Sequence, residues 1–136
     1  MKILLVFLIA MILRGEENYI LKYGNSLSPE FQKIAIELHI KNPLGIRILV
    51  KEKILGFGGI RGLAINRGIL IKKECMNDKA TLIHELVHIK QYQDCGGLVK
   101  FLKRYINEMI KYGYWQSPLE IEARTYTEQL KRSKNE

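Results

Sequence analysis

The apolar residues of this chain fall into one continuous run near the start and a series of shorter, periodic segments after it. The run covers residues 3–13 and ends at Arg14 and Gly15. The first periodic segment begins at Ser28 and Pro29, which have the form of an N-cap and a first helical residue. Four apolar residues then follow near one helical face, at positions 31, 34, 35 and 38. This pattern predicts a short amphipathic helix.

The next part of the chain has the pattern of a small β-sheet. Residues 46–50 are rich in aliphatic and β-branched side chains and predict one strand. Two further apolar runs, 62–65 and 69–72, flank an Asn-Arg-Gly turn and predict a β-hairpin. The glycines between residues 56 and 68 are not followed by the helix that a phosphate-binding loop requires. We therefore expect a small antiparallel sheet with a glycine-rich edge.

Three longer helical segments complete the pattern. The first follows an N-cap at 77–78 and runs to about residue 94, before a glycine pair at 96–97. The second covers residues 98–112, with apolar side chains at helical spacing, and the third covers about 117–132. The sequence thus predicts an α+β fold, in which a small antiparallel sheet packs on the first of these helices and on two further C-terminal helices.

Length and charge limit the partners that we expect. The chain has 136 residues, of which 47% are hydrophobic, and this suits one ordinary domain with one core. Its net charge is +8, from 22 Lys and Arg against 14 Asp and Glu. The basic residues are spread along the chain and accompany no nucleic-acid-binding motif. They therefore indicate a solvated basic surface, and no nucleic-acid partner is expected.

The apolar run near the start resembles the hydrophobic region of a secretory signal. A helix of this length spans only about 16 Å, against a hydrocarbon core of about 30 Å, and no clear small-x-small cleavage site follows it. We expect residues 1–14 to form a signal-like or membrane-associating segment, with membrane contact through residues 3–13, and residues 15–136 to form the domain. A buried helix or strand is the competing interpretation.

This segment favours an exported or membrane-associated protein over a cytoplasmic one. In an exported chain, Cys75 and Cys95 could form one disulfide, whereas in a cytoplasmic chain both thiols are expected to be free. The two cysteines do not form a Cys-x-x-Cys pair, so neither is expected to bind a metal ion.

The most specific chemical motif is the sequence His84-Glu85-Leu86-Val87-His88. On a helix, the two histidines stack on one face and can bind the same zinc ion at about 2.0–2.1 Å. A carboxylate between them acts as the general base toward water in zinc hydrolases. Two of the three histidines of the chain take part in this spacing, which favours a metal site over chance recurrence.

The same motif, followed by the segment Pro-Leu-Glu-Ile-Glu-Ala at residues 118–123, resembles the gluzincin metallopeptidases. The resemblance is greatest to the small single-domain minigluzincins. In gluzincins a Glu on a later helix is the third zinc ligand, at the first position of an E-x-E-A pattern. The resemblance implies a zincin-like fold and a Zn²⁺ ion bound by His84, His88 and Glu120, with Glu85 as the base. A metzincin is excluded, because that family needs a His at position 94, which is Asp.

Glu122 is the alternative third ligand. Residues two apart on a helix face roughly opposite sides, so only one of Glu120 and Glu122 can reach the metal. Glu120 also has a structural interpretation, since Ser117 and Glu120 have the spacing of a capping box. The family pattern favours Glu120.

Three further residues bear on the site. Gln91 lies one turn after His88, where it either approaches the metal or faces solvent. Arg124 stands where gluzincins often have an Asp that orients a zinc-bound His, which affects expected catalytic efficiency more than metal binding. Tyr114, beside Trp115, is a candidate hydrogen-bond donor to the transition state, with simple packing as the alternative.

These residues together imply a zinc-dependent peptidase, an endopeptidase rather than an exopeptidase. Its partner would be a peptide or protein substrate that binds along the edge of the sheet. The alternative is a non-catalytic or latent zinc-binding protein that resembles a peptidase and has a regulatory role.

Overall fold

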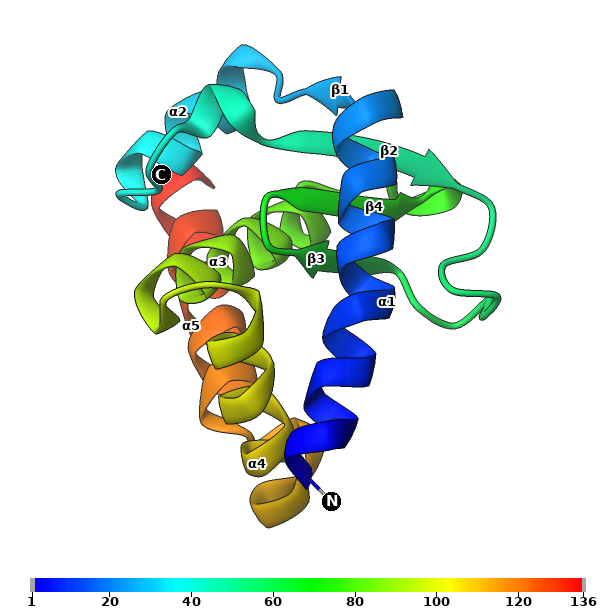
Figure 1. The fold of residues 1–136 in the computed structure, drawn as a ribbon. Helices are drawn as coiled ribbons and strands as arrows, with labels where there is room; N and C mark the ends of the chain where they lie inside the picture. The colour runs from blue at the N-terminus through cyan, green and yellow to red at the C-terminus, as the bar shows by residue number, and fades with distance from the viewer. Residues whose placement is uncertain (1, 136) are drawn as a thin grey trace.

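The structure, a computed structural model, describes residues 2–135 and combines helices with one mixed β-sheet in an α+β arrangement (Figure 1). Two short 3₁₀ helices, η1 (Pro43–Gly45) and η2 (Lys73–Cys75), lie before and after the strands β2 to β4. Within the described range the other elements are, in order, α1 (Lys2–Tyr23), β1 (Asn25–Ser26), α2 (Pro29–Glu37), β2 (Arg47–Lys51), β3 (Gly62–Ile65), β4 (Gly68–Lys72), α3 (Lys79–Cys95), α4 (Leu98–Gln116) and α5 (Pro118–Asn135).

The four strands are arranged in the order β1-β2-β4-β3, and the sheet is mixed. The prediction of an antiparallel sheet is wrong at its centre, where β2 and β4 pair in parallel from Arg47 opposite Gly68 to Lys51 opposite Lys72. The reason is that the connection over residues 52–61 leaves one strand position empty beside β2 and places β3 beyond it. The hairpin then brings β4 into the empty position, where β4 runs parallel to β2. Only the β1–β2 and β3–β4 pairs are antiparallel.

The hairpin itself is confirmed, and its second strand forms the centre of the core. β3 and β4 are joined at Asn66 and Arg67, and Asn66 takes the left-handed backbone conformation, with φ 57°, that a tight hairpin turn requires. Residues 69–71 of β4 are fully buried. Such a continuous buried run is typical of a strand that is covered on both faces.

Helix α1 lies across the sheet and continues through Gly15 without interruption (Figure 1). Its second half is fixed by Ile20, which packs so closely on β4 that a Cβ on Gly68 would come within 3.0 Å of it. The buried carboxylate of Glu17 accepts hydrogen bonds from the Asn66 side chain, at 3.0 Å, and the Arg67 backbone, at 3.3 Å. Residues 3–13 form the first half of this helix. No helix in the described part of the chain is both long and apolar enough to cross a membrane.

The remaining helices follow the predicted pattern. Ser28 caps α2 by accepting a hydrogen bond from the backbone N–H of Phe31 at 3.4 Å. α3 packs on the edge strand β3, and α4 and α5 pack on α3 (Figure 1). α4 is longer than predicted, because the chain turns sharply at Gly113 (φ 77°) and then makes one more helical turn. Cys75 and Cys95 are both free thiols.

Candidate metal centre

Helix α3 carries the histidine motif and is buried on most of its circumference. The Asp78 side chain caps it by accepting hydrogen bonds from the Ala80 N–H at 3.2 Å and from the Thr81 hydroxyl at 2.7 Å. Gly96 ends it in the left-handed conformation, with φ 95°. Its buried residues are Leu82, Ile83, Glu85, Leu86, Val87, His88, Ile89, Gln91 and Tyr92. The polar members of this set are unusual in a helix interior and mark the region of chemical interest.

His84, His88 and Glu120 bring three ligand atoms together between α3 and α5. The two Nε2 atoms are 3.1 Å apart. The Oε1 atom of Glu120 is 3.1 Å from Nε2 of His84 and 3.2 Å from Nε2 of His88. Ligand atoms around a four-coordinate zinc ion at about 2.0–2.1 Å are about 3.3–3.4 Å apart. The triangle therefore has nearly the size that a zinc site requires.

Glu120 and Glu122 have different environments on α5. Glu120 is 2% exposed and faces the histidines, whereas Glu122 is exposed and accepts a hydrogen bond from the Gln91 side chain at 2.9 Å. Glu120 does not form the capping box, because Glu108 of α4 caps this helix. Oε1 of Glu108 accepts hydrogen bonds from the Ser117 hydroxyl at 3.2 Å and from the Leu119 N–H at 3.0 Å.

Tyr105 is a residue of the site that the sequence pattern did not reveal. Its hydroxyl donates a 2.7 Å hydrogen bond to Oε2 of Glu120, which leaves Oε1 turned toward the histidines. Burial and then the Glu120 hydrogen bond raise the pKa of Tyr105, so the phenol stays protonated as a donor. The helical spacing of Tyr105 predicts that it packs in the hydrophobic core. Its hydroxyl group was the only feature of the sequence that suggested a hydrogen-bond partner.

Gln91 also belongs to the cluster and is 2% exposed. Its Oε1 accepts a 2.8 Å hydrogen bond from Nδ1–H of His88, and its Nε2 donates to the backbone oxygen of Leu119 at 2.9 Å as well as to Glu122. When His88 is neutral, a proton on Nδ1 leaves Nε2 with a lone pair, which is the form that binds a metal ion. Gln91 therefore orients His88 and ties α3 to the start of α5.

Glu85 lies beside the triangle and is 4% exposed. One of its oxygens lies within 4.8 Å of the ligand nitrogens of both histidines. The triangle of His84, His88 and Glu120 is tighter, with all three of its distances at 3.1–3.2 Å. Gly62 at the start of β3 makes room for Glu85, since a Cβ there would come within 3.2 Å of its Cγ.

The charges of the cluster are strongly coupled. Burial opposes protonation of His88, but the hydrogen bond with Glu120 and the charges of Glu85 and Glu120 raise the pKa of His88 to about 9. Burial also acts against the charged form of Glu120, yet its hydrogen bonds to both histidines hold its pKa well below the usual range. Burial raises the pKa of Glu85. The cluster thus contains two buried carboxyl groups, whose ionised forms are stabilised by a positive charge placed between them.

Arg124 and Tyr114 lie near the end of the cluster. The Arg124 guanidinium donates to the backbone oxygen of Trp115, and its Cζ lies 4.8 Å from the centroid of the indole ring. Tyr114 is 45% exposed, and burial followed by the charges of Glu120 and Glu85 raises its pKa. Arg124 therefore holds the aromatic turn after Gly113 and makes no hydrogen bond to either histidine.

No family model, no curated protein and no solved structure matches this chain.

Proposed function

We propose that this protein is a zincin-like metallopeptidase of the gluzincin type, in which His84, His88 and Glu120 hold a Zn²⁺ ion. The observation that carries the proposal is the convergence of three ligand atoms from two helices at 3.1–3.2 Å, around a His-Glu-x-x-His motif. Glu120 follows His88 by 32 residues and reaches it only because α4 folds back between them.

The donor set fits zinc better than it fits magnesium or calcium. Two imidazole nitrogens and one carboxylate oxygen are typical of catalytic zinc sites, whereas the other two ions prefer oxygen ligands. Two of the three ligands are supported by a further hydrogen bond: Gln91 fixes His88, and Tyr105 fixes Glu120. When bound, zinc would lower the pKa of a coordinated water and polarise the carbonyl group of a substrate.

Glu85 is the proposed general base. Its carboxylate lies next to the ligand triangle, and burial raises its pKa, which makes it a better proton acceptor. Glu85 would take the proton of the attacking water and return it to the leaving amine. Tyr114 remains the proposed donor to the developing oxyanion, since it lies close enough to Glu120 and Glu85 for their charges to act on it.

The substrate is proposed to be a peptide or protein that adds to the edge of the sheet. β3 lies at one end of the strand order and packs on α3, so its outer edge runs beside the metal helix. Gly62 begins this strand next to Glu85. An extended peptide paired with β3 would pass the base and the metal ligands, which suits cleavage within a chain.

The Glu85→Gln variant tests the enzyme proposal. The parent is expected to bind one zinc ion and to cleave members of a diverse peptide library. Glu85→Gln keeps the size of the side chain and the zinc ligands, so it should retain zinc and lose cleavage by at least about a hundredfold. The matched control is Glu74→Gln, which alters an exposed glutamate and should change neither property.

Two results would contradict this proposal. Unchanged cleavage in Glu85→Gln would remove the assigned base. A parent protein that binds zinc stoichiometrically and cleaves no peptide would favour the alternative, a non-catalytic or latent zinc-binding protein of regulatory function.

A further inference from the structure

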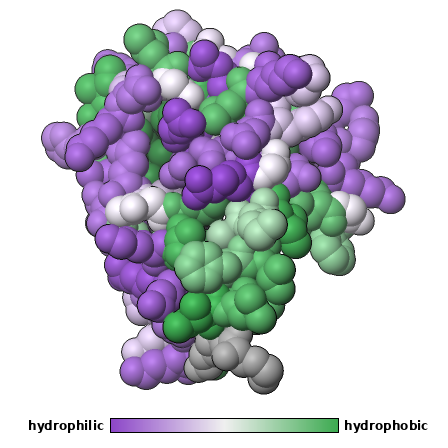
Figure 2. All heavy atoms as spheres, in the orientation of Figure 1, coloured by the Kyte–Doolittle hydropathy of each residue, from purple (hydrophilic) through white to green (hydrophobic). Residues whose placement is uncertain are grey.

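The first half of α1 carries more large, exposed apolar side chains than any other helix or strand of the described chain. Large side chains of this half-helix are between 50% and 71% exposed, and we call them the apolar α1 face: Ile3, Leu4, Leu5, Phe7, Leu8, Met11 and Ile12. Figure 2 shows this face as one continuous hydrophobic area over the lower part of α1. A contiguous apolar area of this kind on a folded protein marks a surface that contacts another apolar phase.

The opposite side of the same half-helix is fixed to the protein. Val6 and Ala10 are buried, and α1 packs against α4. Lipid therefore cannot surround α1 without breaking this packing. The apolar α1 face can meet a membrane only with the helix lying along the surface, with one side in contact with protein and the other in contact with lipid.

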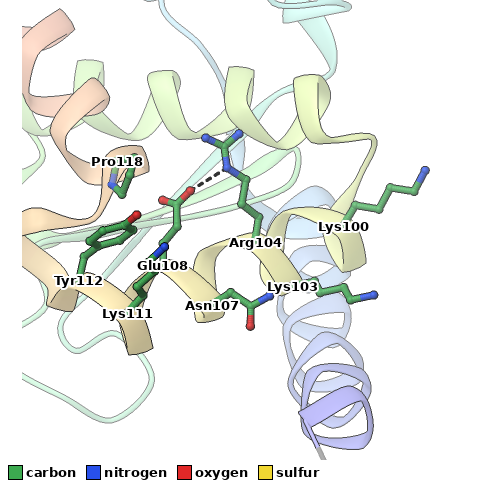
Figure 3. A pocket seen from close by; sticks show the side chains of 8 residues that line it. All are labelled: Lys100, Lys103, Arg104, Asn107, Glu108, Lys111, Tyr112 and Pro118. Carbon is green, nitrogen blue, oxygen red and sulfur yellow. Dashed lines mark hydrogen bonds and ion pairs between the residues drawn. The ribbon is translucent and has the colours of Figure 1, made fainter.

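Helix α4, which packs against α1, carries a basic surface of its own. We call its exposed side chains Lys100, Lys103, Arg104 and Lys111 the basic α4 face; they line an open hollow together with Asn107, Glu108, Tyr112 and Pro118 (Figure 3). Figure 3 shows Lys100 and Lys103 extending away from the helix. Among the described residues Arg104 is paired with Glu108, at 2.8 Å, while the three lysines make no ion pair. None of the proposed zinc ligands lines this hollow.

We propose that the apolar α1 face and the basic α4 face together dock the protein on the surface of a bilayer that contains anionic lipids. Apolar side chains would enter the boundary between headgroups and acyl chains, and the lysines would contact phosphate groups. Both faces are needed, because a single weak membrane signal gives only reversible, marginal binding. The net charge of +8 strengthens the attraction to an anionic surface.

Charge favours a membrane over a second copy of this chain as the occupant. Two copies joined through the apolar α1 face would carry a combined charge of twice +8. This shared positive charge opposes such an association, whereas anionic headgroups neutralise the lysines. This inference uses neither the histidine cluster nor the proposed peptidase activity.

Vesicle co-sedimentation of the full chain tests the proposal. The parent is expected to bind vesicles of phosphatidylcholine with about 30% phosphatidylglycerol at least about tenfold more strongly than pure phosphatidylcholine vesicles. Binding to the anionic vesicles should weaken as salt rises from about 0.05 M to 0.5 M, since screening acts on the lysines. Equal binding to both vesicle types, or no binding to either, would overturn the proposal.

Two double variants separate the contributions of the faces. Leu4→Asp with Met11→Asp should reduce binding to anionic vesicles at least about tenfold, and Lys100→Glu with Lys103→Glu should remove the preference for them. The matched controls are Ile36→Asp, at an exposed apolar position of α2, and Lys33→Glu with Lys53→Glu, at exposed positions away from α4. The Ile36→Asp control should bind like the parent, and the lysine control, which loses the same net charge as the α4 variant, should keep the preference for anionic vesicles.

Met11→Asp alone keeps the test valid if the double variant does not fold, since Met11 is the most exposed residue of the face at 71%. Unchanged vesicle binding in a folded Met11→Asp protein and in the folded double variant would overturn the proposal. Self-association of the parent that these variants abolish, without any vesicle binding, would show that a second copy covers the face.

Discussion

Two regions of this protein reverse the usual distribution of polar and apolar side chains. Between α3 and α5, imidazole, carboxylate and amide groups are buried and connected to one another by hydrogen bonds. On the first half of α1, large apolar side chains are exposed. Burying polar groups and exposing apolar ones both cost stability, so each region indicates a ligand that is not part of the chain.

The two regions differ in how tightly the fold determines them. Both ring nitrogens of His88 and both carboxylate oxygens of Glu120 have specific hydrogen-bond partners, so the positions of these ligand atoms are fixed. The apolar α1 face has no such partners, and its composition matters more than the position of any one side chain. α4 packs beside both regions: its Tyr105 hydroxyl is bonded to Glu120, and the helix also packs against α1. A specific ion fits the first region, and a non-directional lipid surface fits the second.

The largest expected effect is a loss of zinc affinity in Glu120→Ala, which should alter the metal site and leave the apolar α1 face unchanged. Glu120→Ala removes a ligand atom and should lower zinc affinity at least about a hundredfold, without changing vesicle binding. Glu122→Ala is the matched control two residues away and should cost no more than about tenfold, since Glu122 is hydrogen-bonded to Gln91 and to neither histidine. Equilibrium zinc titration with a competing chelator measures both. A greater loss in Glu122→Ala would mean that the ligand assignment is wrong.

Gln91→Leu should have the next largest effect. It removes the acceptor for Nδ1–H of His88 and the donor to the Leu119 carbonyl, so zinc affinity should fall about 10–100-fold and unfolding free energy by about 1–3 kcal/mol. Gln91→Glu retains an acceptor for His88 and should recover part of the zinc affinity. Gln93→Leu, which loses only a link to the Lys41 backbone, should leave zinc binding unchanged. Equal zinc affinities for Gln91→Leu and Gln91→Glu would show that Gln91 does not orient His88.

Tyr105→Phe tests the support of Glu120 with a smaller change. The variant keeps the ring packing and removes one charge-assisted hydrogen bond, so zinc affinity should fall about fivefold. Tyr112→Phe on the exposed side of α4 is the control and should behave like the parent. If the two variants have the same zinc affinity, the hydroxyl of Tyr105 does not stabilise the ligand geometry.

Met11→Asp is expected to have the smallest effect in the absence of lipid. Because Met11 is 71% exposed, its replacement should change the unfolding free energy by less than about 0.5 kcal/mol and leave zinc affinity unaltered. Chemical denaturation of the lipid-free protein measures this. A loss of several kcal/mol would mean that the apolar α1 face is covered by the protein itself.

Much of the local structure could be predicted from the sequence, because local signals determine it. Ser28 and Asp78 cap the helices that they were expected to begin, and the Asn-Arg-Gly turn forms the hairpin. The parallel pairing of β2 with β4 could not be predicted, because no local sequence pattern specifies which of the two hairpin strands pairs with β2. The buried run in β4 was the available sign that this strand is central.

The residues of the candidate site likewise fall into those that the sequence predicts and those that depend on how the helices pack. The i and i+4 spacing of His84 and His88 follows from helix geometry alone. The sequence left Glu120 and Glu122 as alternatives. The rotation of α5 about its own axis, as it packs on α3, determines which of the two faces the histidines. Tyr105 and Glu108 were not predicted as members or supports of the site. Their partners lie on another helix, so their roles depend on how α4 packs against α5.

The most direct test of the central claim is a crystal structure of the zinc-loaded protein with anomalous scattering recorded at the zinc edge. The account predicts one strong anomalous peak about 2.0–2.2 Å from Nε2 of His84, Nε2 of His88 and Oε1 of Glu120, with Glu85 beside it and not bound to it. A peak coordinated by Glu122 in place of Glu120, or no peak between α3 and α5 in zinc-saturated crystals, would contradict it.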